Sequence, residues 1–262
     1  MQRVDCAIMF DFFFGFLYHK SSLDAQNSKR SCFMDKYFSK VLTERQEDVI
    51  SHIAGVGGFD LDLVQYIKTE EYFDDPSSID IAIFAPTDNF NYYLVSTVGF
   101  SSYQPDPKLA RAEIFMLLPP SWKWDLEKEE YNWPVEMLKI VSRGLIDNNK
   151  GAGLFQIVKV ADDSFSDGTD VIGGVLCFPE MNALEFVEEK IGDTYTRFFN
   201  LVPLNKAQLG KIEDVGVKAF VEFDLHDADG PVGFVAQEPQ VKKGSNIDKI
   251  IEHNTNSLNK KG

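Results

Sequence analysis

Residues 112–118, with the sequence AEIFMLL, limit the fold more than any other segment because nearly all of them are apolar. Pro119 and Pro120 close the run, as expected at the end of a strand. Alternate side chains of a strand face opposite sides, so this run presents apolar groups in both directions. Such a strand belongs to a sheet covered on both faces, or covered on one face with a dimer or flap over the other.

Further strands are predicted by short runs of β-branched and aromatic residues bounded by turn residues. These strands are residues 79–85, 91–99, 154–160, 171–178 and 195–202. The linker TDNF between the first two is short enough for a β-hairpin.

Helices are predicted by apolar residues at helical spacing and by capping residues. The first covers about residues 35–54 and is stopped by the glycines within residues 55–58. Pro134 is predicted to open a second helix. Asn205, with a glutamine three residues later, predicts a capping box for a third helix, and Asp214 is predicted to cap a fourth.

This order of elements predicts the α+β class: a single domain with a central, mostly antiparallel or mixed, twisted sheet flanked by helices. We place the domain at residues 34–230, between an N-terminal extension (1–33) and a C-terminal tail (231–262). Met34 opens a segment typical of a natural amino terminus, so the extension is interpreted as the product of a mis-set start codon. The basic tail is interpreted as a solvated segment, with docking onto a partner or onto the acidic body as the alternative.

The chain is strongly acidic, with 41 Asp and Glu against 26 Lys and Arg and a net charge of −15. Binding to a nucleic-acid backbone needs a basic face, so nucleic acid is not an expected partner. A basic protein is the better candidate, because opposite charges accelerate association.

Three dispersed cysteines form no CxxC pair, which indicates free thiols in a reducing compartment. The longest apolar stretch, residues 8–18, is too short to span a membrane and is split by Asp11. Because no cleavage site follows it, a signal peptide is disfavoured. We therefore expect a cytoplasmic protein that does not bind a membrane.

No motif in the sequence supplies a catalytic or metal-binding set. The four histidines are dispersed, and neither an HExxH zinc motif, a phosphate-binding loop nor a GxSxG elbow occurs. Two stretches resembling calcium loops lack the Glu that an EF-hand needs at its last position. The sequence thus predicts no enzyme activity, no catalytic residue, no metal and no cofactor.

Acidic residues and tryptophans instead predict a contact surface for a basic partner. Carboxylates select basic groups, and aromatic side chains are effective interface anchors, although a core role for the aromatics remains the alternative. The candidate partner-binding residues are Asp60, Asp62, Glu70, Glu71, Asp74, Asp75, Trp122, Trp124, Glu127, Glu129 and Glu130.

Four motifs in a fixed order resemble the suppressor of fused (SUFU) domain family. Residues 77–102 resemble its strand–turn–strand, which ends here in TVGFS, and residues 111–124 resemble its R-x-E strand, closed by Leu-Pro and a tryptophan. Residues 133–145 resemble its W-P helix, and residues 198–225 its closing strand with two helices.

The resemblance implies an α+β fold without catalysis. Animal members hold Gli transcription factors inactive in Hedgehog signalling by gripping a peptide as an added β-strand between two domains. This chain resembles the first of those domains alone, as single-domain bacterial members do, and many of these are regarded as immunity proteins against toxins delivered between competing cells. We therefore expect an intracellular immunity protein that neutralises a basic toxin domain; the alternative is a regulatory module that adds a peptide strand to its sheet edge.

Overall fold

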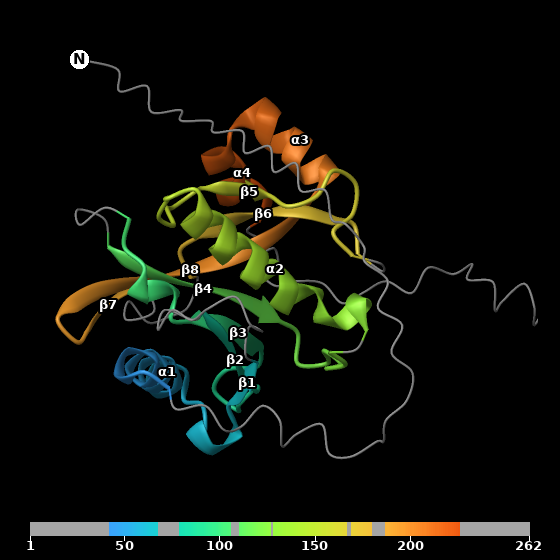
Figure 1. Cartoon of the computed structure of the whole chain (residues 1–262). Coiled ribbons are helices and arrows are strands. Elements are labelled where there is room, and N and C mark those ends of the chain that lie inside the picture. Colours follow the sequence, from blue (N-terminus) through green and yellow to red (C-terminus); the bar gives the residue numbers. More distant parts are fainter. Residues whose placement is uncertain are drawn as a thin grey trace, which may run out of the picture.

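The computed structural model describes residues 42–67, 79–105, 110–126, 128–166, 169–179 and 187–225. These residues form one mixed, eight-stranded sheet flanked by helices, so the predicted α+β class is confirmed (Figure 1). The elements in chain order are α1 (Glu44–Gly57), η1 (Leu61–Leu63), β1 (Gln65–Ile67), β2 (Asp80–Phe84), β3 (Tyr93–Val98), η2 (Phe100–Ser102), β4 (Arg111–Leu118), α2 (Glu129–Asp147), β5 (Ile157–Lys159), β6 (Val171–Cys177), β7 (Glu188–Ile191), β8 (Thr194–Asn205), α3 (Lys206–Val215) and α4 (Val217–Asp224).

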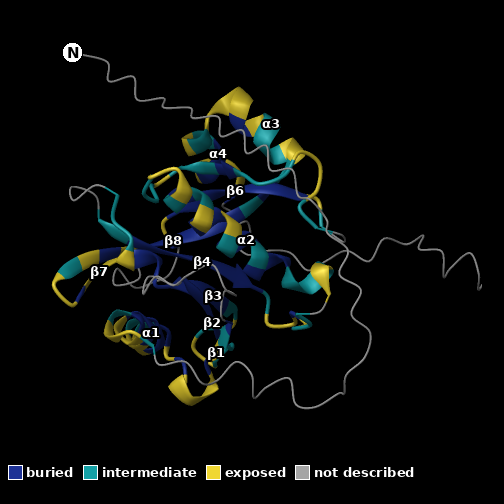
Figure 2. Ribbon diagram, viewed as in Figure 1, coloured by how far each residue is buried: buried dark blue, intermediate teal, exposed yellow. Residues whose placement is uncertain are grey.

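The sheet is covered on both faces, as the apolar sequence of β4 predicts. Phe115 and Leu117 pack in one cluster with the buried side of α1, whereas Ile114 and Met116 pack in another with α2. A third cluster joins β6 and β8 to α3 and α4. In Figure 1, α2 crosses the middle of the sheet, α1 lies toward the bottom of the view and α3 and α4 toward the top. Figure 2 shows the strands between these helices as mostly buried.

Strand order is β1-β2-β3-β4-β8-β6-β5, with β7 pairing beside β8. The predicted hairpin of β2 and β3 is confirmed, with Asp80 opposite Val98 and paired backbone bonds between Thr87 and Phe90 closing the turn. All pairs are antiparallel except β4 with β8. β1 and β5 therefore stand at the two ends of the described sheet.

Three helix starts differ from the expectation. α1 begins at Glu44 rather than near residue 35, because Thr43 is extended and forms a capping box with Gln46. α2 begins at Glu129, so Pro134 lies inside the helix instead of opening it. Asp214 belongs to α3 and caps nothing; Gly216 precedes α4 without a side-chain cap.

Other helix boundaries agree with the sequence. Asn205 and Gln208 form the predicted capping box at the start of α3. Gly58, at φ 67°, takes the left-handed conformation that ends α1. Among the described residues, no helix combines the length and the apolarity needed to cross a bilayer. The apolar stretch 8–18 and the two predicted terminal segments lie outside the described residues.

Gly173 in β6 permits the close approach of the edge strand β5. A Cβ at this position would lie 2.5 Å from the carbonyl oxygen of Val158 and 3.1 Å from the Cα of Lys159. Both atoms belong to the backbone, so the strand itself would have to move. We expect Gly173→Ala to lower the free energy of unfolding by about 1–3 kcal/mol in urea denaturation.

Gly210, within α3, is the matched control because a Cβ there meets no atom within 4 Å. Gly210→Ala is expected to raise the free energy of unfolding by about 0.5–1 kcal/mol, since alanine favours a helix interior. Equal effects of the two substitutions would contradict the steric explanation.

Candidate functional site

Asp60 and Asp62 lie on the exposed turn that carries η1. The Asp60 side chain accepts a hydrogen bond from the backbone N–H of Asp62 at 3.0 Å, which fixes the start of this turn. Within the part of the chain that the structure describes, no Lys or Arg forms an ion pair with either carboxylate. Among the described residues, their negative charges are therefore left without a cation.

Two leucines alternate with these aspartates. Leu61 is 50% exposed and Leu63 is 63% exposed, although both are large and apolar. The turn leads into β1, which pairs only with β2 in the described sheet. We name residues 60–67 the acidic edge; its η1 turn is the exposed segment beneath β1 in Figure 2. It combines exposed carboxylates, apolar contact area and an edge strand.

Four of the predicted contact residues follow β1 directly in the sequence. These are Glu70, Glu71, Asp74 and Asp75, and they lie outside the described residues, as does Glu127. Glu129 is exposed and Glu130 half-buried at the start of α2.

The two predicted tryptophans have different environments. Trp122 is only 3% exposed, donates its indole N–H to the Tyr131 carbonyl oxygen at 3.2 Å, and packs edge-on against Trp133. Trp124 is half-buried and meets Tyr93 in a T-shaped contact with ring centroids 5.6 Å apart. Trp122 is therefore a core residue. Of this pair, only Trp124 presents part of its ring to solvent.

Strand register places the acidic edge and Trp124 at the same end of the sheet. Gln65 pairs with Ile83 near the end of β2, and Tyr93 at the start of β3 pairs with Leu118 at the end of β4. Three strand spacings, about 14 Å, separate β1 from β4. η1 follows α1 on one face, whereas Trp124 packs with the α2 cluster on the other. The acidic edge and Trp124 thus lie at the same end of the sheet but on opposite faces.

Sequence reasoning missed a buried polar centre around Glu113. This carboxylate accepts hydrogen bonds from the Thr97 hydroxyl at 2.6 Å and from the backbone N–H groups of Gly99 and Ser101, each at 3.0 Å. Gly99, at φ 110°, makes the turn that points these N–H groups inward. Complete burial raises the pKa of Glu113, against the opposing effect of its hydrogen bonds.

Two arginines attach neighbouring elements to this centre. Arg45 of α1 donates to the Ser101 hydroxyl at 2.9 Å and to the Thr196 hydroxyl of β8 at 2.6 Å. Arg111 donates to the Ser101 carbonyl oxygen at 2.8 Å. Burial, and then the nearby Arg111, lower the pKa of Arg45. The centre therefore joins α1, the η2 turn, β4 and β8.

The Glu113 centre is suited to holding the fold rather than to catalysis. Its carboxylate has no exposed surface for a substrate to reach, and its hydrogen bonds go to the protein's own backbone and hydroxyl groups. Within residues the structure describes, no group of three His, Cys, Asp or Glu side chains is arranged to hold a metal ion. The signal in the sequence is a lone glutamate inside an otherwise apolar strand, since such a charge needs partners when it is buried.

Comparisons with known proteins agree with this fold. The family model described as "Suppressor of fused protein (SUFU)" matches residues 75–251. A solved SUFU homologue from Neisseria gonorrhoeae FA 1090 is 14% identical with a TM-score of 0.51, over 70% of this chain and 92% of that one. No curated protein matches the sequence.

Two further solved structures share the fold. A chain of the Sufu–Fu complex is 13% identical with a TM-score of 0.55, over 79% of this chain and 94% of that one. Drosophila Suppressor of Fused is also 13% identical, with a TM-score of 0.54, and is covered over 56% of its length by 84% of this chain.

Proposed function

Because this chain belongs to the suppressor of fused family, we propose that it is a non-catalytic protein-binding domain whose partner is a basic protein. The family is one of protein-binding regulators, and one structural relative was solved as the Sufu–Fu complex. For this chain, the proposal rests on the acidic edge. Its two aspartates lack a cation among the described residues and stand between exposed leucines.

The specific role we propose is that of a bacterial, cytoplasmic immunity protein. A toxin domain that acts on nucleic acid has a basic surface, because its substrate is a polyanion. A protein with a net charge of −15 would attract that surface at long range and cover it. Glu129 and Glu130 add two carboxylates in the first turn of α2, a few positions after Trp124 in the sequence.

A peptide-binding regulatory module is the second candidate function, and the open sheet edges favour it. β1 and β5 each have one described neighbour, so each offers backbone groups to an incoming strand. Salt separates the two functions. Binding led by charge weakens steeply as ionic strength rises, whereas backbone pairing with an added strand weakens little.

Neutralising the acidic edge should slow association with the partner. We expect Asp60→Asn with Asp62→Asn to lower the association rate constant about tenfold at low ionic strength, because the local attraction is lost. Asparagine keeps a side-chain oxygen for the turn at position 60, so the fold is preserved. The measurement is surface plasmon resonance against a basic toxin domain from which co-expression of this chain rescues cells.

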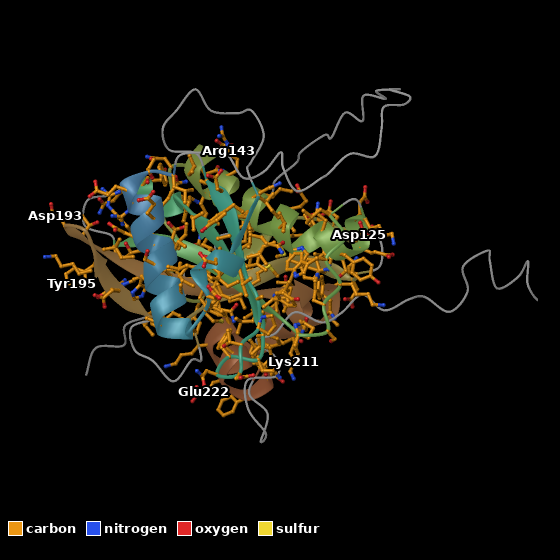
Figure 3. The ribbon with its side chains drawn as sticks, turned by 90° about the horizontal axis from the view of Figure 1, so that it is seen from below. Asp125, Arg143, Asp193, Tyr195, Lys211 and Glu222 are labelled. Carbon is orange, nitrogen blue, oxygen red and sulfur yellow. The ribbon has the colours of Figure 1, made fainter. Side chains whose placement is uncertain are left out.

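The matched control removes the same number of charges elsewhere. Asp193→Asn with Glu222→Gln changes exposed carboxylates at separate, outlying positions (Figure 3), and it should alter the rate less than twofold. Equal slowing by both pairs would assign the attraction to net charge and not to the acidic edge. Failure of co-expression to rescue the cells would refute the immunity role.

A further inference from the structure

β7 forms a hairpin with β8, and its other edge pairs with no strand that the structure describes. Gly192 and Asp193 join the two strands, and Gly192, at φ 60°, takes the left-handed conformation that suits a two-residue turn. Arg45 of α1 donates to the Ile191 carbonyl oxygen at 3.3 Å and to the Thr194 hydroxyl at 3.1 Å. The hairpin is therefore held in place by the rest of the domain.

The backbone groups of Glu188 and Lys190 point away from β8. The N–H of Phe198 donates to the Val187 carbonyl oxygen at 3.1 Å, so these two residues form a hydrogen-bonded pair. In an antiparallel ladder such pairs alternate with pairs that are not hydrogen-bonded, so the next hydrogen-bonded residue of β7 is Glu189. Glu188 and Lys190, on either side of it, therefore turn their N–H and C=O groups toward the outer edge.

The side chains of these two residues carry opposite charges on one open face of the hairpin. Glu188 is exposed and forms an ion pair with Arg197 of β8 at 2.6 Å. Lys190 is exposed and lies opposite Tyr195, which is 59% exposed and stands at an outlying end of the molecule (Figure 3). The other face is covered, because Ile191 packs in the cluster with α1. The edge thus joins outward backbone groups to one negative and one positive side chain.

A second copy of β7 is complementary to this edge. Two copies that run antiparallel about a two-fold axis at Glu189 place each Glu188 opposite the Lys190 of the other copy. Because both residues turn their backbone groups outward, each such pair exchanges both of its N–H···O hydrogen bonds. An axis at Glu188 or at Lys190 would instead put like charges opposite each other, which is unfavourable.

We propose that this chain forms a symmetric dimer through antiparallel pairing of β7 with β7 of a second copy, in the register that opposes Glu188 and Lys190. The two sheets then form one continuous sheet with the two β7 strands at its centre. β2, β3, β4 and β8 lie between β7 and the acidic edge at β1, so the dimer contact leaves both acidic edges uncovered. The dimer does not depend on the proposed basic partner, because it uses a different edge of the sheet.

One contact opposes this pairing. The two-fold axis places Glu189 opposite Glu189 of the other copy, and like charges directly opposite each other are destabilising. Because the interface is also small, the dimer is weak and reversible. We expect Glu189→Gln to lower the dissociation constant of the dimer about threefold in sedimentation equilibrium, since the repulsion is removed.

Charge reversal in the full-length chain tests the register. Lys190→Glu puts a glutamate opposite Glu188, and Glu188→Lys puts a lysine opposite Lys190. Each variant alone should therefore dissociate with a constant at least about tenfold above that of the wild type. In an equimolar mixture, the mixed dimer has opposite charges in both pairs, so its dissociation constant should lie within about threefold of the wild-type value.

The matched controls make the same changes of net charge on α4. Lys218→Glu and Glu222→Lys alter exposed residues, and Glu222 lies well apart from Tyr195 in Figure 3. Each should change the dissociation constant less than about twofold. The exposed ion pair of Glu188 with Arg197 contributes little stability, so the Glu188→Lys variant stays folded, which circular dichroism checks.

Three results would overturn the proposal. A wild type that stays monomeric at about 100 μM would show that this edge is covered or that repulsion prevails. A dimer that Lys190→Glu leaves intact would use another surface. A mixture of the two variants that stays monomeric, while the wild type forms dimers, would exclude the register that opposes Glu188 and Lys190.

Discussion

Replacement of Glu113 by Ala is expected to lower the free energy of unfolding by about 3–5 kcal/mol. The substitution leaves the Thr97 hydroxyl and the N–H groups of Gly99 and Ser101 buried without their acceptor. It also removes the buried negative charge that attracts the guanidinium of Arg45. The measurement is equilibrium denaturation in urea, monitored by tryptophan fluorescence.

Glu113→Gln is the matched control, because it keeps the length of the side chain and one carbonyl oxygen. That oxygen can accept from one or two of the three donors, so the expected loss is smaller, about 1–2 kcal/mol. A loss below 1 kcal/mol for Glu113→Ala would contradict the view that this carboxylate joins the turn at Gly99 to the sheet.

The strands that carry a strong local pattern were predictable from the sequence. In β4 both alternating sets of side chains are apolar, and these sets do contact helices on opposite faces. β7, in contrast, has the sequence EEKI and lies at the outside of β8, so no apolar alternation marks it. β1 escaped prediction because its three residues are too few for an alternating pattern to stand out.

Helix starts failed where several signals competed. Proline at position 134 suits a first turn, but the preceding residues Glu129 to Trp133 are also compatible with a helix and extend it backward. At α1, the apolar spacing continues before Thr43, whereas the capping box of Thr43 with Gln46 sets the start of the helix at Glu44. Local spacing therefore located both helices without setting their first residue.

For the candidate site, the sequence predicts which residue types are present but not which of them come into contact. The sequence shows that Glu113 is charged and that Thr97 is polar, but the contact between them depends on the register that brings β3 beside β4. Likewise, Asp60 and Asp62 are visibly acidic, while the absence of an ion pair to either from a described residue and their position before an edge strand follow from tertiary structure. The contact role of both aspartates stays a prediction.

Substitution of Trp122 by Ala is expected to reduce the free energy of unfolding by about 3–5 kcal/mol. The indole fills the core between β4 and α2, contacts Trp133 at a centroid distance of 6.0 Å and satisfies the Tyr131 carbonyl oxygen. Trp122→Phe keeps a ring but removes the N–H donor, so it should cost about 1–2 kcal/mol. Both values come from chemical denaturation of the isolated protein.

Trp124→Ala tests whether this side chain stabilises the fold or contacts the partner. Its half-buried ring touches Tyr93, so its removal should cost less stability than that of Trp122, about 1–2 kcal/mol. If Trp124 also anchors the partner, its loss should weaken binding at least tenfold under conditions where the variant is fully folded. Trp122→Phe, which retains the core packing, should then leave affinity nearly unchanged. A Trp122→Phe variant that is stable but cannot bind would instead show that this buried ring is itself a contact, exposed only when the partner is engaged.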